Sequence, residues 1–222
     1  LKSFGSGLQI HMGRFSPEGV SVLRGESSGS RLKSGGYGRY DNWGFRALLA
    51  PPAGSKTPKE VKLDLGNGVS MEFVYIKPGT FTMGGESTKD GRFECVETPK
   101  HKVTLTKGYY LGKFEVTQVQ YEAITGSKPS KTTKGPNYPV NNVTEDEAVQ
   151  FCEGASNKTG QFIRGPFEAE WEHAARAGTD STWFCGDSDG QLGDYAWIKT
   201  NSTTKTHEVG QKKPNPWGLY DM

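Results

Sequence analysis

Glycine, proline and large aromatic rings are the feature that most limits what this chain can fold into. Its 222 residues include 30 Gly, 12 Pro, 11 Phe, 9 Tyr and 5 Trp, whereas only 33% of the residues are hydrophobic. Glycine and proline interrupt long helices, and large rings can hold irregular segments against a core. We therefore expect many loops and little regular structure. The length suits one sizeable core, or one domain with part of a second.

Charge and hydropathy narrow the range of partners. The 27 basic and 25 acidic side chains give a net charge of +2, too balanced for the positive field that nucleic acid or an anionic membrane requires. No apolar run is long enough to span a bilayer, and the start, LKSFGSGLQI, does not resemble a signal peptide. We expect a soluble, already trimmed chain that binds no nucleic acid and inserts into no membrane. The oligomeric state and the compartment stay open, an extracellular or cell-surface location being one option.

A change of composition divides the chain. The stretch APPAGSKTPKEVK has the Pro, Gly, Ser and Lys content of a solvated linker. We therefore predict that residues 51–62 link a segment of residues 1–50 to a segment of residues 63–222. After the linker, MEFVYIKPGTFTMGG predicts strands closed by a Pro-Gly turn, and HKVTLTKGYYLGKFEVT predicts two more short strands.

Three helices are predicted from capping residues followed by apolar residues at helical spacing. The first follows Thr117, a good N-cap. The second begins at Thr144, which can form a capping box with Glu147. The third is predicted from GPFEAEWEHAARAG, with Pro166 fit for its first turn and Gly178 as its stop. The predicted buried faces comprise Ala148, Phe151, Cys152 and Ala155 on the second helix and Trp171, Ala174 and Ala175 on the third.

Five motifs in order carry a resemblance. They are GTFTMGG, ETPKHKVTLTKGYYLGKFEVTQVQYEAI, YPVNNVTEDEAVQFC, EAEWEHAARAG and NPWGLYDM. Across residues 72–222 the chain strongly resembles formylglycine-generating enzymes and sulfatase-modifying-factor proteins. The resemblance implies an α+β fold, a C-type-lectin-like domain of low regularity with short strands, about three helices and long loops. Tyr121, Trp171 and Trp217 would then be core anchors.

The start of the chain resembles the end of the same family. Relatives usually continue beyond GLYDM into a Gly-Asn-x-Trp-Glu-Trp segment and the part that holds the active site. Here the stretch from Arg24, Gly25 and Ser27 to Gly44, Phe45 and Arg46 resembles that terminal part, which opens with Arg-Gly-Gly-Ser and closes with Gly-Phe-Arg. Either the domain is circularly permuted, or the chain joins the end of one tandem domain to most of the next. We favour permutation, because the termini of compact domains commonly lie close together.

The cysteine pair of the enzymes is missing. In those relatives two cysteines between the terminal anchors bind copper(I), which prefers soft thiolates, and drive oxidation of a substrate cysteine by O₂. No cysteine lies between Arg24 and Arg46 in this chain. Copper is therefore not supported, and the sequence leans away from an enzyme. The three cysteines that are present, Cys95, Cys152 and Cys185, indicate neither a disulfide framework nor a zinc site, although Cys95 and Cys185 could approach each other.

The stretch SSGSRLKSGGYGRYDNWGFR suggests a ligand-binding surface instead. Its Ser, Gly, Tyr, Asn, Asp, Arg and Trp content is that of a paratope. Relatives of this fold occur as variable proteins of diversity-generating retroelements, in which a segment ending near Gly-Phe-Arg is mutated to create binding surfaces. The alternative is a glycine-rich loop whose Tyr and Trp fold into the core. The candidate ligand-binding residues are Ser28, Ser30, Arg31, Lys33, Tyr37, Arg39, Tyr40, Asp41 and Asn42.

Calcium is the one cofactor that the resemblance supports. The family commonly binds calcium through loop oxygens, and CGDSDGQLGDYAW offers the carboxylates of Asp187, Asp189 and Asp194. The spacing is not that of an EF-hand, and such Asp/Gly loops are often simple turns. The four histidines are scattered, so we expect no iron site of the kind that sulfoxide synthases of the family use.

These observations favour a non-catalytic domain that binds a protein or glycan ligand on a formylglycine-generating-enzyme-like scaffold. The alternative is a metal-dependent oxidoreductase of the sulfatase-modifying-factor family, with an unrecognised metal site or a site completed by another chain. A third interpretation is a structural module of a larger surface protein.

Overall fold

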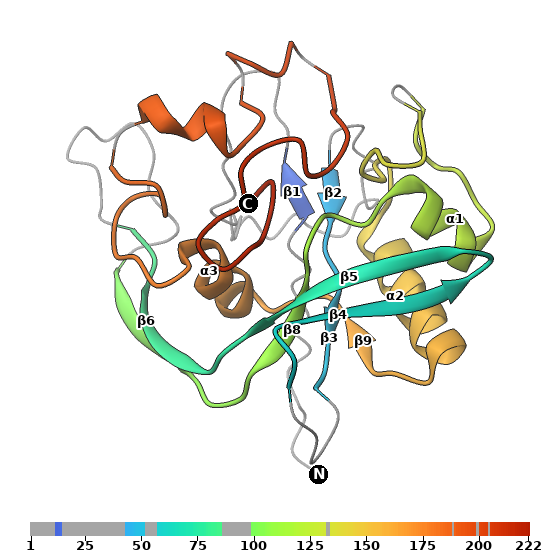
Figure 1. The fold of residues 1–222 in the computed structure, drawn as a ribbon, viewed down its shortest axis with the longest axis horizontal. Helices are drawn as coiled ribbons and strands as arrows, with labels where there is room; N and C mark the ends of the chain where they lie inside the picture. The colour runs from blue at the N-terminus through green and yellow to red at the C-terminus, as the bar shows by residue number, and fades with distance from the viewer. Residues whose placement is uncertain are drawn as a thin grey trace, which may run out of the picture.

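Five antiparallel strands form the central sheet of the computed structural model, in the order β4–β5–β8–β3–β9 (Figure 1). The structure describes residues 12–14, 43–51, 57–85, 99–131, 134–187, 189–198, 200–203 and 205–222. The sheet strands are β3 (Leu48–Leu49), β4 (Glu60–Gly66), β5 (Val69–Ile76), β8 (Tyr109–Gly112) and β9 (Ile163–Arg164). Two smaller sheets pair β1 (Met12–Arg14) with β2 (Trp43–Phe45) and β6 (Gly79–Met83) with β7 (His101–Leu105).

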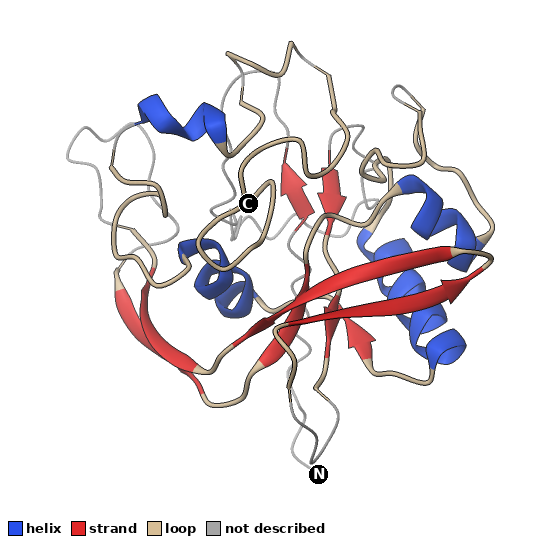
Figure 2. Ribbon diagram, in the orientation of Figure 1, coloured by secondary structure: helices blue, strands red, loops and turns tan. Residues whose placement is uncertain are grey.

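Helices flank the sheet and long loops connect the elements (Figure 2). The helices are α1 (Gln118–Thr125), α2 (Glu145–Thr159), α3 (Glu168–Arg176) and the 3₁₀ helix η1 (Asp189–Asp194). The predicted α+β class with short strands, three helices and long loops is therefore confirmed. Among the described residues, none of the helices combines the length and the apolar character that crossing a bilayer requires.

The helix ends follow the capping residues read from the sequence. Thr117 and Thr144 are the N-caps of α1 and α2, and each closes a capping box. The prediction for α3 needs a correction at its start, because Phe167 is the N-cap and Pro166 lies before the helix. The Glu170 carboxylate accepts a hydrogen bond from the Phe167 backbone N–H at 2.7 Å, which fixes the helix start one residue after Phe167.

Strand β4 and its hairpin with β5 were not predicted from the sequence, although MEFVYI was predicted as a strand and forms most of β5. Strand β4 begins at Glu60, inside the range 51–62 expected to be a linker. The turn contains Asn67 and Gly68, both with positive φ, 56° and 75°. An Asn-Gly pair between two alternating apolar runs is the usual signal for such a hairpin.

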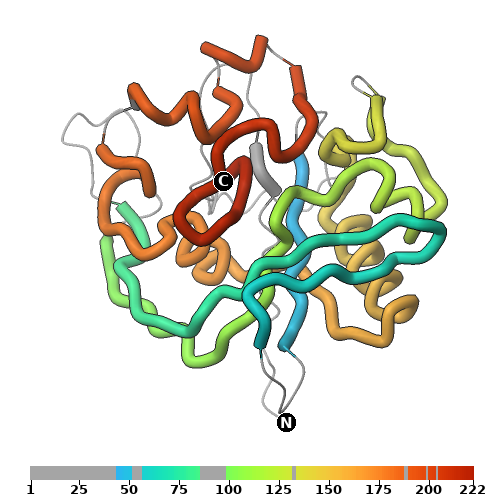
Figure 3. Tube along the Cα trace, viewed as in Figure 1, coloured from blue at the N-terminus to red at the C-terminus, as the bar shows by residue number. Residues whose placement is uncertain are grey.

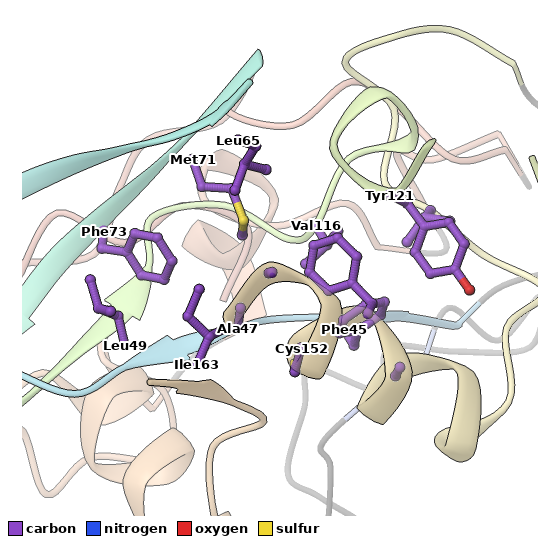
Figure 4. Close-up of a cluster of buried hydrophobic side chains, with 14 of the residues drawn as sticks. Phe45, Ala47, Leu49, Leu65, Met71, Phe73, Val116, Tyr121, Cys152 and Ile163 are labelled. Atoms are coloured by element: carbon purple, nitrogen blue, oxygen red, sulfur yellow. The ribbon is translucent and has the colours of Figure 1, made fainter. Parts of the chain in front are cut away.

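The centre of the sheet is buried on both faces, and this creates two core clusters. All four residues of β8 are buried, because successive side chains point to opposite faces and both faces are covered. Tyr110 joins the cluster beneath α1 and α2, whereas Tyr109 and Leu111 join the one beneath α3. Figure 4 shows the first cluster, with Phe45 and Tyr121 among its labelled rings.

Residues 43–51 run through the centre of this architecture (Figure 3). Leu48 pairs with Leu111 of β8 and Arg164 of β9, so β3 lies between these two strands. Leu48 contributes to the second cluster, whereas Phe45 and Leu49 contribute to the first. Both cores of residues 57–222 therefore include side chains from the segment that precedes the predicted linker.

Candidate functional site

A buried arginine holds the chain just after β2. Arg46 is only 2% exposed, and burial lowers the pKa of its guanidinium. Its Nη1 donates to the carbonyls of Gly112 and Lys113, both at 3.0 Å. Its Nη2 donates to the carbonyls of Tyr220 and Asp221. One side chain thus joins β2, the end of β8 and residues 220–221, and these bonds offset part of the cost of burying its charge.

Two buried carboxyl groups share this environment. Glu115 and Asp221 are 6% and 8% exposed. Burial raises the pKa of Glu115 to about 7, Arg46 opposes the rise, and Asp221 adds to it. Burial also raises the pKa of Asp221, although the Gly210 N–H donates to its Oδ2 at 2.7 Å. With two carboxyls against one guanidinium, the cluster favours retaining a proton near neutral pH.

Backbone contacts fix β2 against this cluster. The N–H of Val116 donates to the Phe45 carbonyl at 2.8 Å, and the N–H of Gly112 donates to the Ala47 carbonyl at 2.8 Å. A Cβ on Gly44 would lie 2.4 Å from Oε1 of Glu115, so a side chain at this position would displace the Glu115 carboxyl group. These backbone hydrogen bonds therefore hold residues 45–47, including Arg46, in place beside Glu115.

The candidate ligand-binding residues lie outside the described residues. They are Ser28, Ser30, Arg31, Lys33, Tyr37, Arg39, Tyr40, Asp41 and Asn42. What the structure adds is the anchor that follows them in the chain, residues 43–46.

The predicted calcium residues lie in and beside η1. Asp187 accepts a hydrogen bond from the Thr182 N–H at 2.7 Å, and Lys213 Nζ donates to Asp194 Oδ2 at 2.8 Å. These hydrogen bonds lower the pKa of both carboxyls, so both are ionised at neutral pH. The side chain of Asp189 is outside the described part. In that part, no group of three His, Cys, Asp or Glu side chains is arranged to hold a metal, so the calcium site stays a prediction.

Comparison with known proteins decides the family. Residues 66–222 match the Sulfatase-modifying factor enzyme 1-like domain. The chain belongs to this family. The resemblance inferred from the five motifs is thereby confirmed.

Relatives of this sulfatase-modifying-factor chain have different names. It is similar in structure to Treponema denticola variable protein 1, with 27% identity, a TM-score of 0.64 and coverage of 74% of this chain and 73% of that one. It is also similar to PvdO from Pseudomonas aeruginosa, with 26% identity, a TM-score of 0.63 and coverage of 75% and 72%. In sequence it is 28% identical, over 204 residues, to chaperone protein LppX of Paenibacillus barcinonensis, and the match covers 69% of each protein.

The described thiols of this sulfatase-modifying-factor domain are not activated. Cys152 is buried on α2, and burial raises its pKa to about 12. Cys185 is a half-buried free thiol whose pKa burial also raises. A raised pKa lowers the thiolate fraction, the form that attacks substrates or binds metals. Cys95, which was considered as a partner of Cys185, lies outside the described residues.

The described histidines make separate contacts. His101 is exposed and hydrogen bonds to the Pro99 carbonyl at 3.0 Å. His173 on α3 is 5% exposed and packs edge-on against Trp217, with ring centroids 4.9 Å apart. His207 stacks on the indole of Trp197 at 3.6 Å. Each therefore has a packing or hydrogen-bonding role in the domain.

Sequence reasoning missed Glu115 and Asp221. Glu115 stands between Phe114 and Val116, just after a buried strand, and a lone acid in such a position signals a buried charge. Their shared partner Arg46 could not be found from the local sequence, because it lies 69 positions from Glu115 and 175 positions from Asp221.

Proposed function

We propose that this chain is a non-catalytic ligand-binding domain on the sulfatase-modifying-factor scaffold, and that residues 28–42 contact a protein or glycan ligand. The observation that carries the proposal is a cysteine-free span that leads into a buried anchor. No cysteine lies between Arg24 and Arg46, and Arg46 is fixed by four backbone carbonyls. A binding segment gains affinity when its base is held in place, because less freedom is lost on association.

The names of two relatives support a binding role. One solved relative is a variable protein, and the paratope-like composition of residues 28–42 suits a surface that differs from one protein to another. A second relative is named a chaperone protein, and chaperones act on polypeptides. The oxidoreductase alternative would need an activated thiol or a metal, and both described cysteines have raised pKa values that disfavour the thiolate.

Two further proposals concern the scaffold. We propose that Asp187, Asp189 and Asp194 bind calcium, supported by carboxyls at Asp187 and Asp194 that are ionised at neutral pH. We also propose that residues 1–50 and 63–222 form one circularly permuted domain. The support for this proposal is that β3, which precedes residues 51–62, pairs with β8 and β9, which follow them. If residues 1–50 belonged to a preceding domain, that domain and this one would each have an incomplete core.

The test of the binding proposal compares the full chain with the variant Tyr37→Ala/Arg39→Ala/Tyr40→Ala. Ligands are selected on a glycan array and from a displayed random peptide library. We expect the triple variant to lose at least about tenfold in affinity, since two aromatic contacts and an arginine often dominate a binding surface. The exposed Lys107→Ala variant is the control and should bind as the original chain does.

Two results would contradict the proposal. One is equal binding of every selected ligand by the triple variant while its melting temperature is unchanged. The other is oxidation of a cysteine-containing peptide to an aldehyde by the copper(I)-loaded chain with uptake of O₂, which would establish the oxidoreductase.

A further inference from the structure

A surface pocket of about 330 Å³ lies between α1 and residues 128–130 and 134–136 of the loop that follows it. We call it the α1 pocket. The helix contributes Gln118, Val119 and Glu122, and α1 with its following loop can be found on the right of Figure 1. The volume is at the lower end of the range for ligand sites, roughly 300–1,000 Å³, so the pocket suits one large side chain.

The walls of the α1 pocket are preformed. The N–H of Val119 donates to the Pro136 carbonyl at 3.3 Å, which ties the far end of the loop to the helix. The near end is held by Asn142, whose Nδ2 donates to the Pro129 carbonyl at 2.8 Å. A pocket that is already ordered loses little conformational freedom when a ligand enters.

Internal hydrogen bonds occupy the polar groups of the walls. Gln118 accepts from the Gly135 N–H at 3.2 Å and donates to the Pro139 carbonyl at 3.4 Å. The hydroxyl of Ser130 exchanges bonds with the backbone of Asn141. The apolar part of the surface, which is the larger part, comes from Val119, Pro129 and Pro136.

The loop beside this apolar floor is basic. Lys128 and Lys134 line the pocket, Lys131 lies between them in the chain, and all three are exposed. We call these three lysines the rim. Glu122 is the one acidic group among the described lining residues, and it pairs with Lys128 at 3.0 Å. The whole chain has a net charge of only +2, so this rim concentrates positive charge that an anionic partner would complement.

We propose that the α1 pocket binds an acidic peptide segment of a partner protein, with one apolar side chain on Val119, Pro129 and Pro136 and its neighbouring carboxylates against the lysines. A glycan fits less well, because the wall's polar groups are already bonded and the described lining residues include no aromatic ring for stacking. The described lining residues of the α1 pocket include none of residues 28–42, so variants in the two places test the two proposals independently.

Fluorescence polarisation with a labelled Glu-Glu-Phe-Glu-Glu peptide tests the proposal on the full chain. At about 50 mM salt we expect this peptide to bind with a dissociation constant in the micromolar to millimolar range. The peptide Glu-Glu-Ala-Glu-Glu should bind at least about tenfold more weakly, because its apolar anchor is lost. Affinity should fall several-fold at about 300 mM salt, because the charge contacts are exposed. A Lys-Lys-Phe-Lys-Lys peptide should not bind.

Two pocket variants and one control locate the site. Val119→Glu puts a carboxylate on the floor near the start of α1, where the helix tolerates it, and should weaken binding by at least about tenfold. Lys131→Glu/Lys134→Glu reverses two rim charges without touching the floor and should also weaken it by about tenfold. The exposed Lys62→Glu on β4 makes one substitution of the same type elsewhere on the surface and should alter affinity by less than about twofold.

Several outcomes would overturn the proposal. The first is that the Phe, Leu and Met versions of the acidic peptide all fail to bind at about 1 mM. The second is that Val119→Glu binds the peptide as tightly as the original chain does. The third is that the chain binds phosphatidylserine vesicles but not the peptides. The variant Tyr37→Ala/Arg39→Ala/Tyr40→Ala should bind the acidic peptide normally. Failure of this site is therefore distinguishable from failure of the proposed function.

Discussion

Replacing Glu115 by glutamine should change how the stability of this domain depends on pH. The pKa of the buried Glu115 carboxyl is raised from 4.5 to about 7, mainly by burial. A carboxyl with a higher pKa in the folded state binds its proton more tightly there than in the unfolded chain. Its contribution is fully present below about pH 4.5 and is lost as the pH rises through about 7.

The magnitude follows from the size of the pKa shift. At about 1.4 kcal/mol per pKa unit, the free energy of unfolding should decrease by about 3 kcal/mol between about pH 4.5 and 7.5. That is a large part of the ~5–15 kcal/mol that stabilises a typical domain. Glutamine has nearly the same shape but no proton to lose. The variant should therefore lack this decrease, while Arg46 and Asp221 remain in both proteins.

Urea unfolding of the original chain and of Glu115→Gln, at several values between about pH 5 and 8.5, measures the effect. The stability of the variant relative to the original should rise with pH over this range. Glu153→Gln, an exposed carboxyl on the same protein, is the control and should leave the pH dependence unchanged. A stability difference that stays within about 0.5 kcal/mol across the range would refute the buried, proton-retaining state of Glu115.

Two further predictions test the scaffold proposals. Calcium at about 100 times its dissociation constant should raise the melting temperature by about 5 °C or more, measured by differential scanning fluorimetry against an EDTA control. The variant Asp187→Asn/Asp194→Asn should abolish this shift. No shift of the original chain at about 10 mM calcium would contradict the site. A rewired chain in which residues 57–222 precede residues 1–51 through a flexible linker should keep the oligomeric state of the original and melt within about 5 °C of it. A rewired chain that fails to fold would favour the tandem arrangement.

Local chemistry was enough to predict the helices. Thr117 and Thr144 cap α1 and α2 because each side chain accepts from a backbone N–H three residues on, and that partner is near in sequence. The buried face of α2 followed from its spacing, and Ala148, Phe151 and Cys152 are buried as predicted. Tyr121 and Trp171, expected as core anchors, are 3% and 5% exposed.

Longer-range contacts were less accessible from the sequence. Strand β3 has only two residues, Leu48 and Leu49, too few to show a strand pattern. The buried cluster is equally hidden, since Arg46 and Asp221 meet from opposite ends of the chain. Pro166 was expected inside α3, but the Glu170 carboxylate at the Phe167 N–H determines where that helix starts.

The central position of residues 43–50 bears on both fold and function. Leu48 and Leu49 face opposite sides of the sheet and complete different core clusters, while Arg46 connects the same segment to residues 112–113 and 220–221. These described contacts use no side chain from residues 28–42. Side chains that bind a ligand could then change without removing the contacts that hold the anchor. A scaffold of this kind keeps stability and recognition on separate residues, which is what a binding domain with a changeable surface requires.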